Sequence, residues 1–400
     1  MSIQETIKNQ ESLRSLLFRT GTGRQIYRYW HRKEQVWHRL RTQCDPLVFF
    51  RYYSPHLTHP AFKRFYEFPP VPWSTKFHAK LNHWINYPDF IDHRPFIIEP
   101  NDHPLAPTGK SEPFDVVSNL VRAEEIYKHR MCKKIIVESE GQLQLFKHYF
   151  EEEVIKKTII LGALPAIPKK IDWQQKSFGK SRTRFLFLAS DFVNKAVDLL
   201  LDAWLNVPER KEAELIVACS NVPQEWERKS YKENVLFIKK APLTEIEKNE
   251  LHQNTDIAIG LQHVDGGANM FEAMEWGLPI IVLRSQRHHG HLQNQNGLMI
   301  DVPFYFYDPE FYGTRWKTFK EFYQILEEAK NKGEFEKTKQ DLRKALSYFI
   351  NNPEKAVMMG KRSFDLTSET FSLEKRNETL LRIYYEALGP QPLNAKKKEL

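Results

Sequence analysis

The feature that most constrains the fold is an alternation of short apolar runs and helical patterns between residues 184 and 284. The runs are RFLFLAS (184–190), AELIVACS (213–220), NVLFIKK (234–240), TDIAIGL (255–261) and LPIIVLR (278–284). Helical patterns lie between them at 197–206, 244–253 and 270–276. Near-continuous apolar strands that alternate with helices are typical of a parallel sheet buried on both faces. This stretch therefore predicts a Rossmann-like α/β domain.

A second alternation precedes the first one, from about residue 45 to residue 160. The runs PLVFFRYY (46–53), PFIIEP (95–100) and KKIIVES (133–139) are predicted strands, and 79–87 and 116–130 are predicted helices. A basic, polar stretch, DWQQKSFGKSRTR (172–184), separates the two series. Because 400 residues exceed the size of a single growing core, we expect two domains, 45–168 and 169–371.

The two ends of the chain have their own patterns. Helical patterns continue at 319–330, 335–351 and 353–359, and a terminal helix is expected over 372–390, its pattern running to about residue 388. Residues 391–400, which include three consecutive lysines, are expected to form a solvated tail. Residues 1–44 are expected to form a basic, aromatic helical segment.

Charge is concentrated near the start of the chain. The net charge is +8, and residues 1–42 hold nine Lys and Arg residues against three Glu, together with Trp30 and Trp37. This mixture is expected of a helix lying on an anionic membrane surface. An ordinary helix packed on its own domain has the same pattern and is the favoured interpretation. No zinc-finger spacing, RNA-binding aromatic motif or dense basic run predicts a nucleic-acid partner.

The cellular compartment of the protein is predicted from patterns that the sequence lacks. The start of the chain has charged and amide groups where a signal peptide would be apolar, and no run of about 18 apolar residues predicts a membrane span. The three cysteines are far apart and odd in number, which favours a reducing compartment. We expect a cytoplasmic protein, with peripheral attachment to the inner face of the membrane as a further hypothesis.

The most informative motif is HVDGGANMFEAMEWGLP (263–279). Gly266 and Gly267 follow a predicted strand and directly precede a predicted helix. Backbone amides can approach a ligand closely there, and the helix N-terminus adds partial positive charge. Such a turn is typical of a phosphate-binding site.

The string GGANMFEAMEWGLPIIV resembles the signature of the retaining GT-B glycosyltransferases, glycosyltransferase family 4. The resemblance implies two Rossmann-like domains facing across a cleft, with a C-terminal helix that crosses back to the N-terminal domain. It also implies that Glu272 binds the ribose hydroxyls of a nucleotide-sugar donor. The remaining residues of this turn are then expected to bind the donor: Asp265, Gly266, Gly267, Ala268, Asn269, Met270 and Phe271. The resemblance implies that the last four of these residues present their backbone amides to the pyrophosphate.

A second stretch, FLFLASDFVNKAVDLLLDAW (185–204), resembles the family's K-G-x-D-x-L-L-x-A motif. The match places Lys195 on the lysine that neutralises the donor diphosphate. Two residues depart from the pattern here: Ser190 stands where the family has arginine, and Ala196 stands where it has glycine. We expect Ser190 to line the donor site, and Arg284 or Arg287 to supply the missing phosphate contact.

A further departure concerns the transferred sugar. Val264 stands where the family has its first glutamate, which lies against that sugar, and the nearest acid is Asp265. His103 follows a predicted strand in the N-terminal half, where relatives place a histidine facing the sugar. The resemblance therefore predicts catalytic roles for His103, Lys195 and Glu272. A loop histidine is also commonly just solvated.

The implied activity is transfer of a sugar from a nucleotide diphosphate-sugar to an acceptor hydroxyl, with retention, in glycan or surface polysaccharide synthesis. The donor is a co-substrate, and a glycan or a lipid-linked molecule is the expected acceptor. No other cofactor and no metal are expected, and His288, His289 and His291 lack a nearby carboxylate. Two alternatives stay open: a nucleotide-sugar epimerase of the same fold, and a catalytically degenerate binding or assembly protein.

Overall fold

The computed structural model describes the chain from residue 95 to residue 388, apart from gaps at 101–115, 162–168, 170, 172, 174–181, 190, 241–242, 264–267, 286–291, 293–294, 307 and 309–318. Before residue 95 it describes four strands, which are β1 to β4.

Within those limits the C-terminal half contains a six-stranded sheet in the order β10-β9-β8-β11-β12-β13. All neighbouring strands are parallel. Counted from β8, the order is 3-2-1-4-5-6, which is the Rossmann arrangement. The strands are β8 (Thr183–Leu188), β9 (Ala213–Ala218), β10 (Val235–Ile238), β11 (Ile257–Gly260), β12 (Ile280–Leu283) and β13 (Gly297–Ile300).

Helices cover both faces of this sheet. Ile281 and Leu283 of β12 belong to the core that includes α8 and α13, whereas Ile280 and Val282 pack with α11 and α14. The helices of this half are α8 (Val197–Leu205), α9 (Gln224–Lys229), α10 (Glu245–Gln253), α11 (Ala268–Glu275), α12 (Phe319–Asn331), α13 (Glu336–Asn351) and α14 (Pro353–Glu369), with a short 3-10 helix, η3 (Arg210–Glu212), before β9.

The N-terminal half contains a five-stranded parallel sheet in the order β3-β4-β5-β6-β7, counted over the described strands. Before it, β1 (Arg24–Tyr27) and β2 (Arg41–Cys44) form an antiparallel pair. The other elements of this half are β3 (Val48–Tyr53), β4 (Leu81–Asn86), β5 (Phe96–Glu99), α5 (Val116–Lys128), β6 (Cys132–Val137), α6 (Glu140–Tyr149), α7 (Glu152–Lys157) and β7 (Thr158–Ile160).

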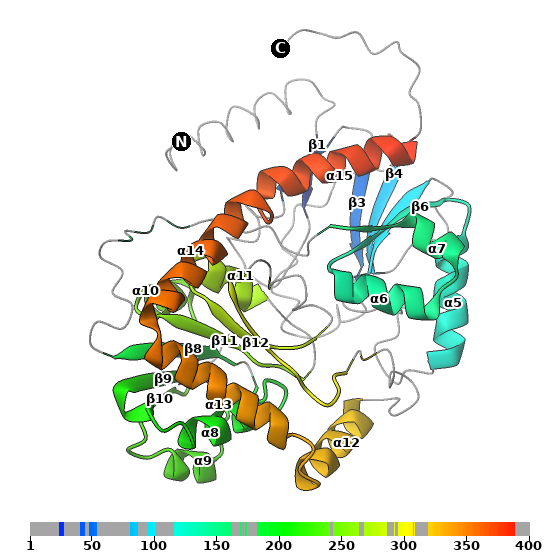
Figure 1. Ribbon diagram of the computed structural model, residues 1–400. Coiled ribbons are helices and arrows are strands. Elements are labelled where there is room, and N and C mark those ends of the chain that lie inside the picture. Colours follow the sequence, from blue (N-terminus) through cyan, green and yellow to red (C-terminus); the bar gives the residue numbers. More distant parts are fainter. Residues whose placement is uncertain are drawn as a thin grey trace.

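The last helix, α15 (Leu373–Leu388), completes the N-terminal half. Figure 1 shows α14 and α15 running from the six-stranded sheet to the five-stranded sheet. Leu380, Ile383 and Tyr384 of α15 pack against Ile97 and Ile136, on one face of the five-stranded sheet. Neighbouring residues of β5 and β6 point to the opposite face and belong to the core with α5, α6 and α7. The final segment of the chain therefore covers a sheet built from its first part.

Two ion pairs also join α15 to this sheet. Arg376 Nη2 lies 3.1 Å from Glu99 Oε1, and the side chains are only 9% and 0% exposed. Lys134 Nζ lies 3.2 Å from Glu386 Oε2 in a more exposed position. Glu99 is the last residue of β5, so the buried pair lies at the carboxyl end of the sheet. His103 lies four residues further along the sequence.

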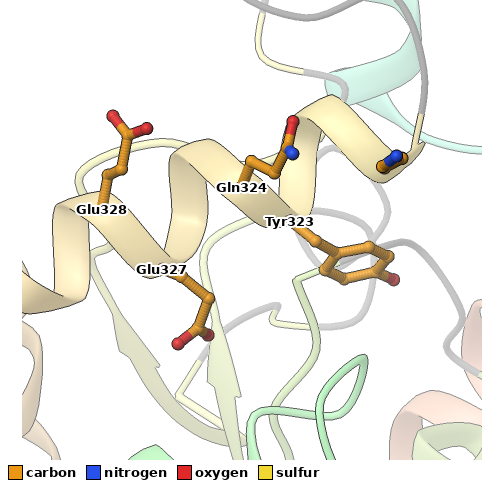
Figure 2. A pocket seen from close by; sticks show the side chains of 5 residues that line it. Tyr323, Gln324, Glu327 and Glu328 are labelled. Atoms are coloured by element: carbon orange, nitrogen blue, oxygen red, sulfur yellow. The ribbon is translucent and has the colours of Figure 1, made fainter.

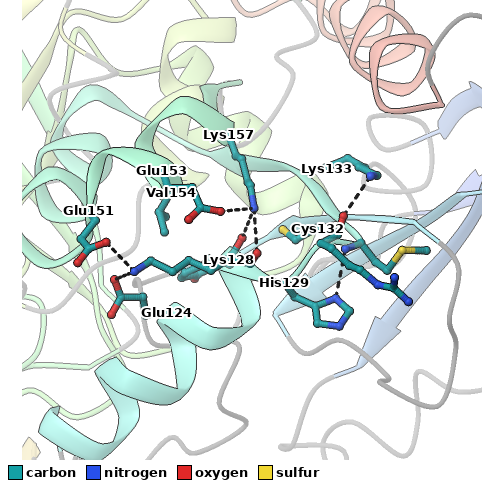
Figure 3. A network of polar contacts seen from close by, with 12 residues as sticks. Glu124, Lys128, His129, Cys132, Lys133, Glu151, Glu153, Val154 and Lys157 are labelled. Atoms are coloured by element: carbon teal, nitrogen blue, oxygen red, sulfur yellow. Dashed lines mark hydrogen bonds and ion pairs between the residues drawn. The ribbon is translucent and has the colours of Figure 1, made fainter.

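A polar network fixes α5 against α7 (Figure 3). Lys157 Nζ donates to the carbonyl oxygens of Tyr127 and Lys128 at 3.1 and 3.2 Å. Carbonyl groups at a helix C-terminus lack intrahelical donors and carry partial negative charge, so a lysine stabilises them. Lys128 in turn pairs with Glu151 at 2.7 Å. These contacts lie in the N-terminal half and support its structure.

The structure corrects two expectations about the N-terminal half. Residues 81–86, expected within a helix, form β4 in the middle of the sheet. Leu81 of this strand is fully buried in the cluster with α15, so tertiary packing decided its conformation. In the segment 1–44, expected to be helical, residues 24–27 and 41–44 are strands that pair with each other. The remaining residues of that segment lie outside the described part.

Elsewhere the predicted strands and helices agree with the structure to within a few residues, and several elements are added. The sequence analysis did not identify β13, α6, α7 or α9, and α14 continues ten residues beyond the predicted end at residue 359. The predicted domain boundary at 168/169 falls between β7 and β8. Within the described residues no helix is long and apolar enough to cross a membrane. The described cysteines, Cys132 and Cys219, are buried free thiols, and burial raises the pKa of Cys132 to about 12.

Candidate functional site

The strand order creates a crevice beside β8. From β8 the chain moves to β9 and β10 on one side, and then crosses to β11 on the other side. In open α/β sheets, ligands bind at the carboxyl ends of the strands where the order reverses in this way. Lys195 follows β8, and Gln262 and His263 follow β11. The fold therefore brings these residues to the position at which a ligand is expected.

Three hydrogen bonds join the segments at this point. Lys195 Nζ donates to Gln262 Oε1 at 2.5 Å. The backbone amide of His263 donates to the carbonyl oxygen of Asn194 at 3.0 Å. Asn269 Nδ2, at the start of α11, donates to the carbonyl oxygen of Leu188 at 3.3 Å. The two predicted motifs, which are about 70 residues apart in the sequence, are thus in direct contact.

The loop that carries Lys195 has a defined shape. Asn194 N donates to Asp191 Oδ1 at 2.7 Å, which is a turn closed by an aspartate side chain. Phe192 N donates to Asn221 Oδ1 at 3.2 Å, and Asn221 Nδ2 donates back to Asp191 Oδ2 at 3.3 Å. Because Asn221 lies just beyond β9, the loop is held from the neighbouring strand. Lys195 is thereby presented from a fixed backbone.

Ala196 has a left-handed conformation, with φ of 51° and ψ of 38°. It directly precedes α8 and is completely buried. This conformation is unfavourable for residues that have a Cβ and is easily adopted by glycine. The glycine that the related motif has at this position is therefore explained by the backbone, and the alanine retains the geometry at an energetic cost.

Substitutions at Ala196 test this explanation. We expect Ala196→Gly to change the free energy of unfolding by less than about 1 kcal/mol, because relief of backbone strain offsets the loss of a buried methyl group and the greater chain entropy of glycine. Ala196→Val is expected to destabilise by about 2–4 kcal/mol, since a β-branched residue with positive φ is strained and adds volume in a buried place. Urea unfolding measures both. Equal stability of the two variants would contradict the explanation.

Glu272 lies on α11 and faces α10. Its carboxylate Oε2 is 3.8 Å from Lys248 Nζ, and both side chains are less than one-tenth exposed. The pair fixes the orientation of the glutamate that the resemblance implies as the ribose ligand. The helix begins at Ala268, where the first turn presents backbone amides with no intrahelical partner.

Gly277 ends α11 and turns the chain into β12. Its φ is +62°, its amide bonds to the carbonyl oxygen of Met274 at 2.9 Å, and the amide of Leu278 bonds to that of Ala273 at 3.0 Å. These two bonds form a Schellman motif, which requires a left-handed residue after the helix. A Cβ on Gly277 would lie 2.5 Å from the Trp173 ring. The Gly-Leu-Pro part of the motif is thus explained by local structure.

His263 contacts the loop that contains Lys195 through the hydrogen bond from its amide to the carbonyl oxygen of Asn194. It is 3% exposed and makes an edge contact with the ring of Phe335. Burial, together with a smaller contribution from the nearby Lys330 ammonium, lowers the pKa of this imidazole to about 3. The imidazole is therefore neutral at physiological pH. Lys330 pairs with Asp198 in the first turn of α8 at 2.6 Å, which connects α12 to the helix that follows the Lys195 loop.

Comparisons with solved structures agree with this fold. No family model and no curated protein matches by sequence. Among solved structures, a glycosyltransferase from Rickettsia africae superposes with a TM-score of 0.51 at 11% identity, covering 79% of each chain. Anabaena HepE with UDP superposes with a TM-score of 0.50 at 13% identity, and the match covers 78% of this chain and 80% of the HepE chain. S. aureus TarM superposes with a TM-score of 0.50 at 14% identity, and the match covers 76% of this chain and 55% of the TarM chain. This chain therefore spans about half the length of TarM.

The fold is GT-B. Each half of the chain contains a parallel α/β unit, and a C-terminal helix crosses back to the first unit. The second unit has the 3-2-1-4-5-6 strand order. The expected fold class is confirmed.

Of the other predicted site residues, Arg284 follows β12 of the GT-B second unit and pairs with Asp301, which follows β13. Met270 and Phe271 point their side chains into the core, so only their backbone can take part in a site. The following predicted residues lie outside the described part: His103, Ser190, Val264, Asp265, Gly266, Gly267, Arg287, His288, His289 and His291. Their predicted roles stay predictions.

Sequence analysis gave no role to three residues at this site. Gln262 and Lys248 lie outside both motifs, and His263 begins the motif 263–279 but was not singled out. Each contacts a matched segment only in the folded protein. The one signal available was the position of Gln262 directly after a predicted strand, where ligand-binding groups are commonly found.

A hollow of about 880 Å³ lies on α12, apart from the residues just described (Figure 2). The lining residues that belong to the described part come from one face of this helix: Lys320, Tyr323, Gln324, Glu327 and Glu328. We place the candidate site at the carboxyl ends of β8 and β11, because the strand order reverses there and the two predicted motifs are in contact.

Proposed function

We propose that this chain is a glycosyltransferase that moves a sugar from a nucleoside diphosphate-sugar to an acceptor hydroxyl. One observation carries the proposal: the segments that follow β8 and β11 are joined where the strand order of a GT-B second unit reverses. Lys195 bonds to Gln262 after β11, and Asn269 in the first turn of α11 bonds to Leu188 at the end of β8. An ammonium group and a helix N-terminus are both suited to an anionic ligand.

The chemistry follows from where charge develops. When the bond between the sugar and the diphosphate breaks, negative charge grows on the leaving diphosphate. Groups that are already oriented toward that charge lower the barrier most effectively. Lys195 is held by Gln262 and by a loop with internal hydrogen bonds, so little reorganisation is needed. Glu272 would hold the ribose, and His103 would lie near the transferred sugar.

Solved proteins of this fold guide the choice of ligand. HepE was crystallised with UDP-glucose, and the pneumococcal O-GlcNAc transferase GtfA with UDP and GlcNAc. Uridine nucleotides are therefore the first ligands to test. We propose retention of configuration, a glycan or lipid-linked acceptor, and no requirement for a metal or a further cofactor. If residues 1–42 contact an anionic membrane, deleting them will abolish co-sedimentation with anionic vesicles.

Removing the charge of Lys195 tests the proposed donor site. We expect Lys195→Met to weaken UDP binding by about 10- to 100-fold, because hydrogen bonds to charged groups contribute about 1.5–3 kcal/mol. Titration calorimetry with UDP, GDP and ADP measures the effect. Glu272→Gln should weaken UDP binding while leaving inorganic pyrophosphate binding unchanged.

The control is Lys229→Met, which removes an exposed lysine of α9 that pairs with Glu225. It should bind UDP like the wild type. Failure of the wild-type chain to bind any of the three nucleotides would reject the donor-site proposal and favour a degenerate binding protein. Conversion of a bound nucleotide-sugar into an isomer without acceptor would identify an epimerase.

A further inference from the structure

Lys248 forms a buried ion pair with Glu272, the residue proposed to hold the donor ribose. The lysine Nζ lies 3.8 Å from the carboxylate Oε2, and the two side chains are 9% and 6% exposed. Lys248 comes from α10, which precedes β11, and Glu272 comes from α11, which follows it. The pair therefore joins two helices that are separated in the sequence by a strand of the candidate site.

The burial of both charges shows what the lysine does for the glutamate. Lysine and glutamate are almost never buried unless they are paired. Withdrawal from water favours the neutral form of a carboxyl group, and a neighbouring cation favours the charged form. Lys248 therefore favours a carboxylate at position 272, and it draws that carboxylate toward α10.

The charge of Glu272 matters for the ligand that it is proposed to bind. The 2′- and 3′-hydroxyl groups of a ribose are neighbouring hydrogen-bond donors. A carboxylate only accepts hydrogen bonds and can accept at both oxygens, whereas the neutral acid has a hydroxyl group that donates. A charged glutamate is thus suited to two ribose hydroxyls, and a 2′-deoxyribose leaves one of its acceptors without that bond.

We propose that Lys248 is a positioning residue that holds Glu272 as a charged acceptor and so sets the preference of the donor site for ribose over 2′-deoxyribose. This inference rests on the proposed function and deepens it, since Lys248 lies outside both matched motifs. Both side chains also have further interactions within the protein. Lys248 accounts for the part of the preference that is lost when its charge is removed.

The ratio of the affinities for UDP and 2′-deoxy-UDP, measured by titration calorimetry, tests the inference. We expect the wild type to bind UDP at least about 10-fold more tightly than 2′-deoxy-UDP, because hydrogen bonds to a charged group are the stronger kind. Lys248→Met should reduce this ratio to about 3-fold or less, because the buried glutamate then favours its neutral form. Inorganic pyrophosphate, which lacks a ribose, should bind this variant as it binds the wild type.

Three further variants separate positioning from structural support. Lys248→Arg keeps the charge and should retain more of the ratio than Lys248→Met. Lys248→Gln removes the charge but keeps a polar side chain, so it gives the same test if the methionine variant does not fold. Lys240→Met is the control, because Lys240 pairs with Glu247 of the same helix at 2.6 Å in an exposed position. It should leave the ratio unchanged.

A purely structural lysine would weaken the binding of UDP and 2′-deoxy-UDP alike. The inference is therefore overturned if Lys248→Met or Lys248→Gln keeps the wild-type ratio. It is also overturned if Lys248→Met lowers the ratio equally with and without Glu272→Gln, since coupled residues do not have additive effects. A wild type that binds UDP and 2′-deoxy-UDP equally overturns this inference and leaves the donor site standing. Absence of UDP, GDP and ADP binding in the wild type overturns the proposed function as well.

Discussion

Arg376→Met is expected to lower the free energy of unfolding by about 3–5 kcal/mol, because it removes one partner of a buried ion pair. Glu99 is completely buried at the end of β5, and Arg376 lies 3.1 Å away on α15. Without the guanidinium group, a carboxylate that has been withdrawn from water loses the opposite charge that Arg376 supplies. The loss is large because methionine supplies no replacement for the lost hydrogen bond.

A matched control lies on the same helix. Arg382 pairs with Glu386 at 3.2 Å, but its side chain is 65% exposed. Arg382→Met should change stability by less than about 0.5 kcal/mol, because solvent screens exposed pairs. Urea unfolding followed by tryptophan fluorescence and circular dichroism gives both values. Similar effects of the two substitutions would show that the Arg376 pair contributes no more than a surface pair.

The substitution is also expected to affect the residues next to Glu99. The backbone oxygen of Pro100, next to Glu99, accepts a hydrogen bond from Gln142 Nε2 at 2.9 Å. Arg376 and Gln142 thus hold Glu99 and Pro100, which precede His103 in the sequence. If the proposed function holds, a protein destabilised at Arg376 is expected to lose acceptor use before it loses UDP binding, since Lys195 lies in the other unit.

Gly297→Ala is expected to destabilise the second unit by about 3 kcal/mol or more. Gly297 begins β13 and is paired with Ile280 of β12. A Cβ at this position would overlap the backbone carbonyl oxygen of Ile280, which cannot move without breaking the parallel ladder. Overpacking a side chain costs about 1–3 kcal/mol, and a backbone obstacle places this change at the upper end.

Gly333→Ala is the comparison for this prediction. Gly333 has a φ of +77°. The atom nearest to an added Cβ would be a side-chain atom of Glu336, at 3.7 Å. Space is available there, so only the left-handed conformation is costly, at about 1–2 kcal/mol. Thermal and urea unfolding of both variants compare the steric and conformational costs. A smaller effect at Gly297 than at Gly333 would contradict the close approach of the two strands.

The missed strand β13 shows where sequence reasoning was limited. Gly297–Ile300 is short and begins with glycine, which ordinarily indicates a turn. In the folded protein the glycine is needed because another backbone passes close to it. Likewise, residues 81–86 have no decisive periodicity, and their position between β3 and β5 made them a strand. Both depend on neighbours that are distant in the sequence.

The sequence by itself determined the parallel sheet of the second unit and the positions of its two motifs, because runs of apolar residues and helix boundaries are local properties. It also predicted Lys195 and Glu272 through a family resemblance. Only the tertiary structure decided that Gln262 holds Lys195, that Lys248 faces Glu272 and that Arg376 reaches Glu99. These contacts depend on strand order and on the return of α15 to the first sheet, which no local pattern specifies.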